Sequence, residues 1–350
     1  MSSEEIQQLQ PDQQYALDRL WPPLTSRYAS ASVSENTRRA YRSDIRHFFI
    51  WGGSLPSTPG QVIRYLEHYA KDLSIRTLKR RVATLNEAHR LLGLDSPADT
   101  SQVRRVLRGI ARTEGRPAKK APPLLLDHAC RLIQHLDGSV SGVRDKALIL
   151  TGWALFLRRS ELVSFRYEDL KFQKDRLILT LNRGKTDQEN TGSTLALPKL
   201  GGPACPVAAI HLWLQVSGIQ NGPVFRRVLR GGNVGSDSQG LTPSSVNLIL
   251  KRRALEAGVD EAMLFSGHSL RRGGITQAYS DQQHESDIQR VSRHKSLIQL
   301  RDYRDMSAAL TGDQPSGTFL EALNSQLSQA ALLSEQIGRA SYVSTRSVMR

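Results

Sequence analysis

The segment Gly115–Pro123 constrains the fold of this chain more than any other stretch of similar length. Its sequence is Gly-Arg-Pro-Ala-Lys-Lys-Ala-Pro-Pro, in which the prolines disfavour helix and the leading glycine is typical of a helix end. Such a segment is expected to be an extended basic linker. It therefore predicts two domains, and 350 residues are enough to give each of them a core.

Five segments are expected along the chain. They are an N-terminal arm (residues 1–33), a first domain (34–115), the linker (116–123), a second domain (124–315) and a last helix with a tail (316–350).

The first domain is predicted to be a bundle of helices. Apolar residues recur at helical spacing in four runs, which begin near Asn36, Thr58, Ile75 and Ser101. Thr58 is followed by Pro59, a pair that is typical of the first residues of a helix. Ser101 is expected to cap the fourth helix. The connections between the runs are short, as in helical bundles.

The second domain is predicted to mix helices with a small sheet. Leu177, Leu179 and Leu181 alternate as in a strand, and a second alternating run around Thr194 and Ala196 suggests a hairpin. Helices are expected at residues 127–136, 143–157, 207–216, 243–257, 269–279 and 286–292, and an amphipathic stretch follows at 319–332. The expected fold class is mainly α, with an N-terminal helical bundle and an α+β domain that contains a small antiparallel sheet.

The net charge of +15 and the pI near 10.1 imply attraction to a polyanion, which can be nucleic acid or an anionic membrane surface. No apolar run approaches the roughly 20 residues that span a bilayer. The N-terminus lacks the basic and apolar regions of a secretory signal. Two cysteines, Cys130 and Cys205, cannot make a disulfide framework, so a reducing cytosol is the expected compartment. A nucleic-acid partner is therefore favoured.

Basic residues gather in the first domain and the linker. Residues 35–120 hold 18 Lys and Arg against 8 Asp and Glu. They form one stripe on the third expected helix and another on the fourth, opposite its apolar face. A single charged stripe is as often a solvated helix face as a site of phosphate contacts. Two such stripes in one small domain favour contacts with phosphates. The residues expected to make these contacts are Arg76, Lys79, Arg80, Arg104, Arg108, Arg112, Lys119 and Lys120.

Six residues of the second domain are of types that together can act on a phosphodiester. In chain order they are Arg158, Lys185, His268, Arg271, His294 and Tyr303. Each type alone is uninformative, because a lone tyrosine is usually a packing residue and a lone arginine is usually a surface charge. Their combination within one domain, with an HxxR element formed by His268 and Arg271, favours a catalytic site.

In-line attack on a phosphodiester needs a nucleophile, neutralised phosphate oxygens, a proton for the leaving oxygen and correct alignment. Arg158 and Arg271 can neutralise the phosphate, because a guanidinium binds its oxygens bidentately and stays charged. Lys185 lies between the two expected strands and can protonate the leaving 5′ oxygen.

The remaining members of the set are two histidines and the nucleophile itself. His268 and His294 can hydrogen-bond the phosphate or shuttle a proton near neutral pH. Tyr303 can attack phosphorus and hold the DNA as a 3′-phosphotyrosine. That ester keeps the energy of the broken bond, so rejoining needs no ATP. No metal or other cofactor is expected.

The order and local spacing of these residues resemble the tyrosine recombinase/integrase family (phage integrase superfamily), and the two-domain layout is similar to its Cre-type members. The resemblance covers roughly residues 145–310. It implies that Arg158 opens the first catalytic arginine box and that Glu161 is the acidic residue that supports it. Two departures stand out. Arg293 occupies a position where the family commonly has glycine, and Arg159 and Arg272 directly follow the two catalytic arginines, so that only the HxxR spacing assigns Arg271.

The resemblance implies a site-specific DNA recombinase with a core DNA-binding domain and a catalytic domain. It would exchange strands through a Holliday junction as a homo-tetramer on two double-stranded, inverted-repeat sites, in the cytoplasm of a bacterial, phage or plasmid setting. The helix at residues 243–257 could enter a major groove. Further expected DNA contacts are Ser244, Ser245, Asn247, Lys251, Arg252, Arg253 and Arg272.

Two alternatives stay open from the sequence. A type IB topoisomerase uses similar chemistry to relax DNA without partner strands, and relaxation without any defined site would favour it. A DNA-binding protein can also keep such a fold without chemistry, although the complete residue set argues against this.

Overall fold

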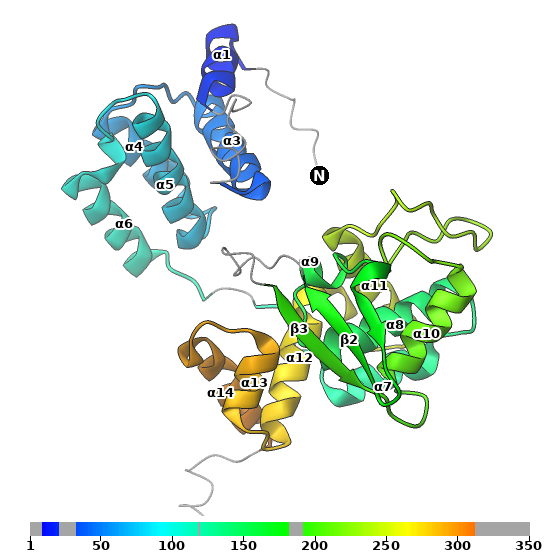
Figure 1. The fold of residues 1–350 in the computed structure, drawn as a ribbon. Coiled ribbons are helices and arrows are strands. Elements are labelled where there is room, and N and C mark those ends of the chain that lie inside the picture. The colour runs from blue at the N-terminus through cyan, green and yellow to red at the C-terminus, as the bar shows by residue number, and fades with distance from the viewer. Residues whose placement is uncertain (1–8, 21–32, 118–119, 182–191, 312–350) are drawn as a thin grey trace, which may run out of the picture. The chain divides into compact units, whose positions relative to one another are not determined.

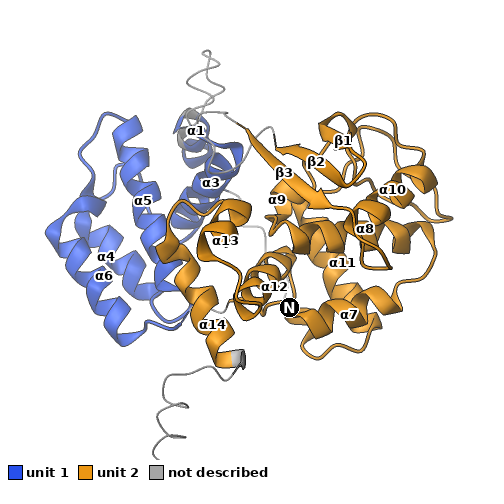
Figure 2. Ribbon diagram, turned by 60° about the horizontal axis from the view of Figure 1, so that its bottom comes forward, with its two compact units in different colours: residues 1–119 blue, residues 120–350 orange. Residues whose placement is uncertain are grey.

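The computed structural model describes residues 9–20, 33–117, 120–181 and 192–311. The chain divides into two compact units, residues 1–119 and 120–350, and each unit has its own hydrophobic core (Figures 1 and 2). The amphipathic stretch predicted at residues 319–332 lies outside the described residues.

All regular secondary structure in the described part of the first unit is helical (Figure 1). They are α1 (Pro11–Leu20), α3 (Glu35–Ile50), α4 (Pro59–His68), α5 (Ile75–Leu91), the short 3-10 helix η1 (Pro97–Asp99) and α6 (Ser101–Thr113). The sequence predicts α3 to α6. Helix α1 is additional, and it packs on α3 with Leu17 and Leu20 buried.

Side-chain caps fix where the helices of the first unit begin. The Thr58 hydroxyl accepts the backbone N–H of Gln61 (3.2 Å), as expected of an N-cap residue followed by proline. At α6 the cap is Thr100, whose hydroxyl accepts the N–H of Val103 (3.4 Å). The prediction that Ser101 caps this helix is therefore wrong by one residue. Ser101 has helical geometry and Thr100 has the extended backbone that a cap requires.

A buried polar cluster joins α3, α4 and α5. Asp44 is buried and forms an ion pair with Arg80. Arg81 donates through Nη1 to the Tyr65 hydroxyl (2.7 Å) and lies 3.0 Å from Nδ1 of His47. Burial lowers the pKa of His47 to about 4, and the positive charge of Arg81 contributes to the shift. These contacts use part of the basic charge of α5 inside the unit.

The second unit combines a small sheet with a larger set of helices (Figure 1). Its helices are α7 (Leu126–His135), α8 (Val140–Ala154), α9 (Arg159–Leu162), α10 (Pro206–Ser217), α11 (Pro243–Glu256), α12 (Gly267–Ser280), α13 (Glu285–Ser292) and α14 (Arg301–Thr311), with the 3-10 turns η2 (Tyr167–Asp169), η3 (Ala262–Leu264) and η4 (Leu297–Leu300). The sequence does not predict α9 or α14.

The sheet is antiparallel, with strands β1 (Leu170–Phe172), β2 (Arg176–Leu181) and β3 (Ser193–Pro198) in that order. Leu177 pairs with Leu197 and Leu179 pairs with Leu195, so the alternating leucines of both strands face the core. The predicted hairpin is thus present, and β1 adds a three-residue edge strand that is too short to show alternation. The described residues confirm the predicted fold class. Among them, no helix is long and apolar enough to cross a bilayer.

Helix α12 contacts α8, α13 and α14 and carries the HxxR residues. Two glycines allow this close packing. A Cβ at Gly273 would lie 1.8 Å from the carbonyl oxygen of Leu124, and one at Gly274 would lie 2.3 Å from that of Trp153. Leu124 donates its N–H to the carbonyl of Ser269 (2.9 Å), and its own carbonyl accepts the Trp153 indole N–H (2.9 Å). The segment that precedes α7 is thereby fixed along α12.

Candidate active site

Arg158 lies at the start of α9, where it is held by a carboxylate three residues further on. Glu161 accepts the backbone N–H of Arg158 (2.9 Å) and its Nη1–H (2.6 Å). The Glu161 side chain is only 3% exposed, whereas 23% of the Arg158 side chain remains exposed. The carboxylate therefore orients the guanidinium and leaves part of it accessible to a ligand.

A second cation, Arg293, shares the same carboxylate. Its Nη2 donates to Glu161 Oε2 (2.7 Å) and its Nη1 donates to the Val291 carbonyl (2.7 Å). Burial alone would raise the pKa of Glu161, but the charge of Arg293 and the hydrogen bonds and charge of Arg158 outweigh it and hold the pKa below its usual range. Glu161 is thus an ionised carboxylate between two arginines.

Arg271 is buried to 1% exposure and points into the same region from α12. Its Nη1 donates to the Phe156 carbonyl (2.6 Å), and its Nη2 donates to the Ser292 carbonyl (2.6 Å). Burial lowers its pKa to about 10, and the neighbouring charge of Arg158 acts in the same direction. The side chain stays charged at neutral pH, and the groups that accept its hydrogen bonds from Nη1 and Nη2 include two neutral backbone carbonyls.

His294 contacts Arg271 directly. Nη2 of Arg271 lies 3.1 Å from His294 Nε2, and the Ser292 hydroxyl lies 2.7 Å from Nδ1. Since the guanidinium can only donate, Nε2 is the acceptor, and the proton of the neutral ring is assigned to Nδ1. Burial and the charge of Arg271 lower the pKa of His294 to about 4, so the ring is neutral at physiological pH.

His268 stands on the first turn of α12 with an exposed side chain. Its pKa still lies below the ordinary value, because the surrounding chain removes part of its hydration and the charge of Arg271 opposes protonation. The adjacent Gly267 donates its N–H to Asn247 Oδ1 (2.8 Å), which ties the start of α12 to α11.

Tyr303 lies on α14, 7% exposed, in a small core with Phe156, Ile275, Ile288 and Leu300. The centroid of its ring is 5.9 Å from that of His294. Among the described residues, none makes a hydrogen bond to its phenolic oxygen.

Arg272 also lies beside Tyr303, with its Cζ 5.7 Å from the tyrosine ring centroid. Its Nη2 contacts Met306 Sδ (3.6 Å), and its buried Nε has no partner among the described residues. Lys120 forms an ion pair with Asp302 (2.5 Å), the residue before the tyrosine. Positive charge therefore borders the start of α14.

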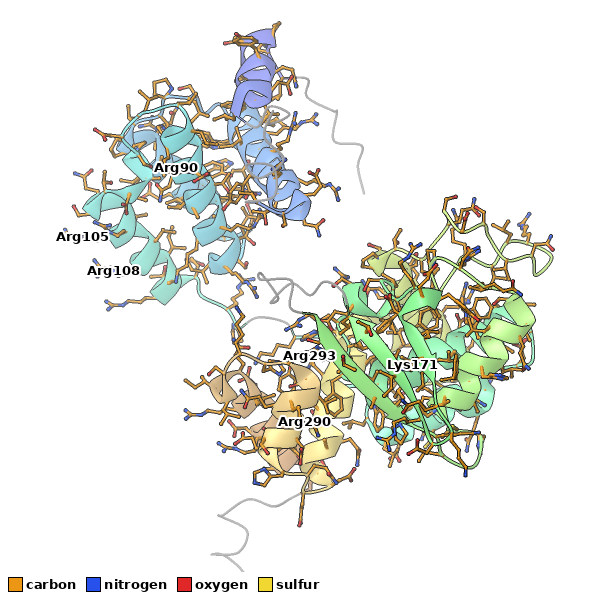
Figure 3. All side chains as sticks on the ribbon, in the orientation of Figure 1. Arg90, Arg105, Arg108, Lys171, Arg290 and Arg293 are labelled. Atoms are coloured by element: carbon orange, nitrogen blue, oxygen red, sulfur yellow. The ribbon has the colours of Figure 1, made fainter. Side chains whose placement is uncertain are left out.

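The structure thus brings five predicted catalytic residues and Glu161 into one region of the second unit. The predicted Lys185 and the predicted DNA-contacting Lys119 lie outside the described residues. Arg293 is a site residue that the spacing of the motifs does not identify, although it appears as a departure from the family pattern. Figure 3 shows it at the end of α13.

Comparison with known proteins agrees with this geometry. Residues 124–309 match the Phage integrase family, and residues 28–93 match the N-terminal SAM-like domain of phage integrases. The chain belongs to the phage integrase family. It is a tyrosine recombinase, a member of an enzyme class that cleaves and rejoins DNA.

Two relatives illustrate the similarity. The integrase/recombinase XerD homolog of Selenomonas ruminantium is 36% identical over 285 residues, which cover 78% of this chain and 82% of the relative. Recombinase Cre of Escherichia phage P1 is 26% identical over 274 residues, which cover 69% of this chain and 76% of that protein. The predicted family is therefore confirmed.

Solved structures share the fold of this tyrosine recombinase. XerH bound to a palindromic difH substrate superposes with a TM-score of 0.56 at 16% identity, over 79% of this chain and 78% of XerH. A lambda integrase dimer bound to a COC′ core site gives 0.56 at 17% identity, over 83% of this chain and 76% of the integrase. The likeness concerns the integrase fold.

The predicted DNA contacts of the first unit differ in how their charge is used. Arg76 and Lys79 are exposed on α5, whereas Arg80 pairs with Asp44. On α6, Arg104 pairs with Asp99 (2.7 Å). Arg108 and Arg112 are exposed on the same helix, and Figure 3 shows Arg105 and Arg108 projecting from it.

The predicted contacts on α11 are also unequal. Ser244 is exposed, and Ser245 hydrogen-bonds the capping Thr242. The side-chain oxygen Oδ1 of Asn247 accepts the N–H of Gly267, whereas its amide N–H₂ group remains available to donate to a base. Arg252 pairs with the buried Asp145 (3.1 Å) and Arg253 does so at 2.7 Å, so both join α11 to α8. Lys251 is half-buried on the same helix.

Proposed function

We propose that this tyrosine recombinase is site-specific and cuts and rejoins DNA through a 3′-phosphotyrosine at Tyr303. The observation that carries the proposal is the charge balance of the site. Arg158 and Arg293 share one carboxylate, Glu161, and Arg271 is hydrogen-bonded to neutral carbonyls, beside a tyrosine with no hydrogen bond from the described residues. A region with such excess positive charge is built to receive an anion.

In the proposed cleavage step, Tyr303 Oη forms a bond to phosphorus while the bond to the 5′ oxygen breaks. Arg158 and Arg271 stabilise the charge that develops on the non-bridging oxygens. His268, which is exposed and neutral, takes the proton of the tyrosine, and Lys185 gives a proton to the leaving oxygen. Attack of a 5′ hydroxyl on the phosphotyrosine reverses the step, so rejoining needs neither a metal nor a nucleotide.

His294 has a different proposed role from His268. Its Nε2 accepts from Arg271 in the free enzyme, so the ring is held beside the guanidinium. A phosphate bound by Arg271 would supply the negative charge that favours the imidazolium form and would let Nε2 donate to a phosphate oxygen. The ring would thus turn from a partner of Arg271 into a ligand of the anion.

We propose further that the enzyme exchanges strands through a Holliday junction, as a homo-tetramer on two double-stranded, inverted-repeat sites. Support comes from relatives of the same fold. The XerH complex contains a palindromic substrate, and one lambda integrase structure is a tetramer bound to a Holliday junction, with a TM-score of 0.55. From the sequence, the amphipathic stretch at residues 319–332 can either dock on a neighbouring protomer or pack on its own domain. The two relatives described above come from a bacterium and a phage, and we assign the reaction to the cytoplasm of such a setting.

The function is tested by covalent trapping on a pool of nicked, randomised duplexes, with Tyr303→Phe as the control. The proposal predicts a DNA adduct that survives SDS in the wild type only, and an inverted repeat among the recovered sequences. An adduct that forms on all sequences alike, together with relaxation of supercoiled DNA, would instead assign a topoisomerase activity. Tight binding without an adduct would assign a non-catalytic role.

A further inference from the structure

We infer that Arg293 is a positioning residue of the active site, which acts through Glu161 to hold Arg158 and the turn that carries His294 in one frame. The inference rests on the proposed function, because it assigns Arg293 a part in the same phosphate site. No motif assigns it, and its position commonly holds glycine in the proteins that the sequence resembles.

The backbone conformation of Arg293 is unusual for a residue other than glycine. It ends α13 in the left-handed region, with φ 55° and ψ 39°. Glycine adopts this region without strain, whereas any side chain with a Cβ adopts it at a cost. The turn itself therefore needs nothing from an arginine, and the side chain is explained only by what it contacts.

The contacts of the Arg293 side chain link it to Glu161. The side chain is 13% exposed, and both terminal nitrogens are used, one on the Val291 carbonyl and one on Glu161 Oε2 at 2.7 Å. Glu161 Oε1 is left to Arg158 Nη1 at 2.6 Å. Each carboxylate oxygen thus has its own arginine, which fixes the rotamer of Glu161 and with it the position of the Arg158 guanidinium.

Arg293 also lies between Ser292 and His294, which both contact Arg271. The carbonyl of Ser292 accepts Arg271 Nη2, and the next residue, His294, accepts from the same nitrogen. The Arg293–Glu161 ion pair therefore fastens the turn at residues 292–294 to α9. The groups that hold Arg158 and those that hold Arg271 become parts of one connected network.

The test compares Arg293→Gly with the wild type on a nicked substrate that carries the recovered site. Glycine keeps the turn and removes the ion pair, so the fold should persist, because relief of the backbone strain offsets part of the stability lost with the ion pair. We expect the rate of adduct formation at saturating DNA to fall about tenfold or more, with little change in DNA affinity. Arg293→Lys, which restores the charge but not the fork, should recover part of the rate.

Gln282 provides the matched backbone control. It is an exposed non-glycine residue with φ 56°, located just after α12, and Gln282→Gly relieves the same kind of strain without touching Glu161. This variant should cleave like the wild type. A similar loss of rate in Gln282→Gly and Arg293→Gly, or a wild-type rate in Arg293→Gly, would overturn the inference.

Two further readouts separate a positioning role from the alternatives. A double-mutant cycle with Glu161→Gln should show that the loss from Arg293→Gly largely disappears once Glu161 is neutral. If Arg293 instead touched the phosphate, its loss would persist in that background and would disappear on a substrate with a neutral methylphosphonate at the cleaved position. That result would contradict a positioning role.

The coupling between Arg293 and Glu161 can be tested without any DNA cleavage. The carboxyl signal of Glu161, followed by carbon NMR against pH, should titrate at higher pH in Arg293→Gly than in the wild type. The other cations that face this carboxylate, Arg158 and Arg271, remain in both proteins. If the wild type forms no adduct but the titration shifts, the proposed function fails and the Arg293–Glu161 coupling stands. An unshifted titration removes the coupling.

Discussion

The guanidinium of Arg271 and the imidazole of His294 lie in direct contact, with Nη2 3.1 Å from Nε2, although 23 residues separate them in the sequence. This contact brings a permanently charged group against one that can titrate. Burial, together with this charge, lowers the pKa of His294 to about 4, so the histidine is neutral in the free enzyme.

Arg271→Ala should abolish most of the cleavage activity. It removes a buried cation together with its hydrogen bonds to two carbonyls, and loss of one such donor typically costs about 100- to 1000-fold in rate. Single-turnover adduct formation measures the effect. Arg271→Lys should recover little, because an ammonium cannot reach the carbonyls and a phosphate at the same time. Near-wild-type cleavage by either variant would remove Arg271 from the site.

The second unit should lose stability as the pH falls from about 6.5 to about 4. The pKa of His294 is lowered in the folded state, so between these values the unfolded chain binds more protons than the folded one and the free energy of unfolding decreases. Because the ring is only partly buried, solvent screening reduces the contribution, which is on the order of 1–3 kcal/mol at most. Denaturant unfolding as a function of pH measures it. His294→Gln should flatten this part of the curve, and an identical pH dependence in the variant would contradict the pKa.

Gly273→Ala should destabilise the second unit. The added Cβ would lie 1.8 Å from the Leu124 carbonyl oxygen, which belongs to the backbone and can move only if α12 or the segment before α7 shifts. Overpacking of this kind costs about 1–3 kcal/mol. Gly109→Ala on α6 is the control, since its Cβ meets nothing within 4 Å and a helical alanine should stabilise by about 0.5–1 kcal/mol. Equal melting temperatures for the two variants would be inconsistent with this packing.

Arg108→Ala should weaken DNA binding more than Arg104→Ala. Arg108 makes no ion pair among the described residues, whereas Arg104 is partly neutralised by Asp99. If Arg108 contacts a phosphate, its loss should lower the slope of log affinity against log salt by about one. Binding of the full chain at several salt concentrations tests this. An unchanged slope in Arg108→Ala would mean that the α6 stripe is a solvated face.

The regular elements of this fold could be predicted from the sequence because their periodicity is local. Thr58-Pro59 marks the start of α4, and alternating leucines mark β2. The elements that the sequence does not show are short or lack an apolar period. Helix α9 has four residues, and α14 begins Arg-Asp-Tyr-Arg-Asp, a pattern with one aromatic residue among charges. It forms where Tyr303 and Met306 pack against α12, which is a tertiary contact.

Five of the described residues of the candidate site follow from motif spacing, but the contacts between them and the part of Arg293 do not. Motif spacing selects Arg158 and Arg271 from many arginines, and the structure places Arg271 with His294 while Arg272 faces Tyr303. The Arg293–Glu161 ion pair joins residues 132 positions apart, so no local pattern reveals it. The sequence shows only that an arginine stands where the family commonly has glycine, and the left-handed turn at this position is seen in the structure.

The central claim is that Tyr303 is the nucleophile, and the most direct measurement is to identify the residue that carries the DNA. The wild-type adduct would be digested with protease and nuclease, and the nucleotide-bearing peptide would be sequenced by mass spectrometry. The account predicts a phosphodiester on Tyr303. A nucleotide on another tyrosine, such as Tyr279, whose hydroxyl donates to Glu285 at 2.8 Å, would contradict it.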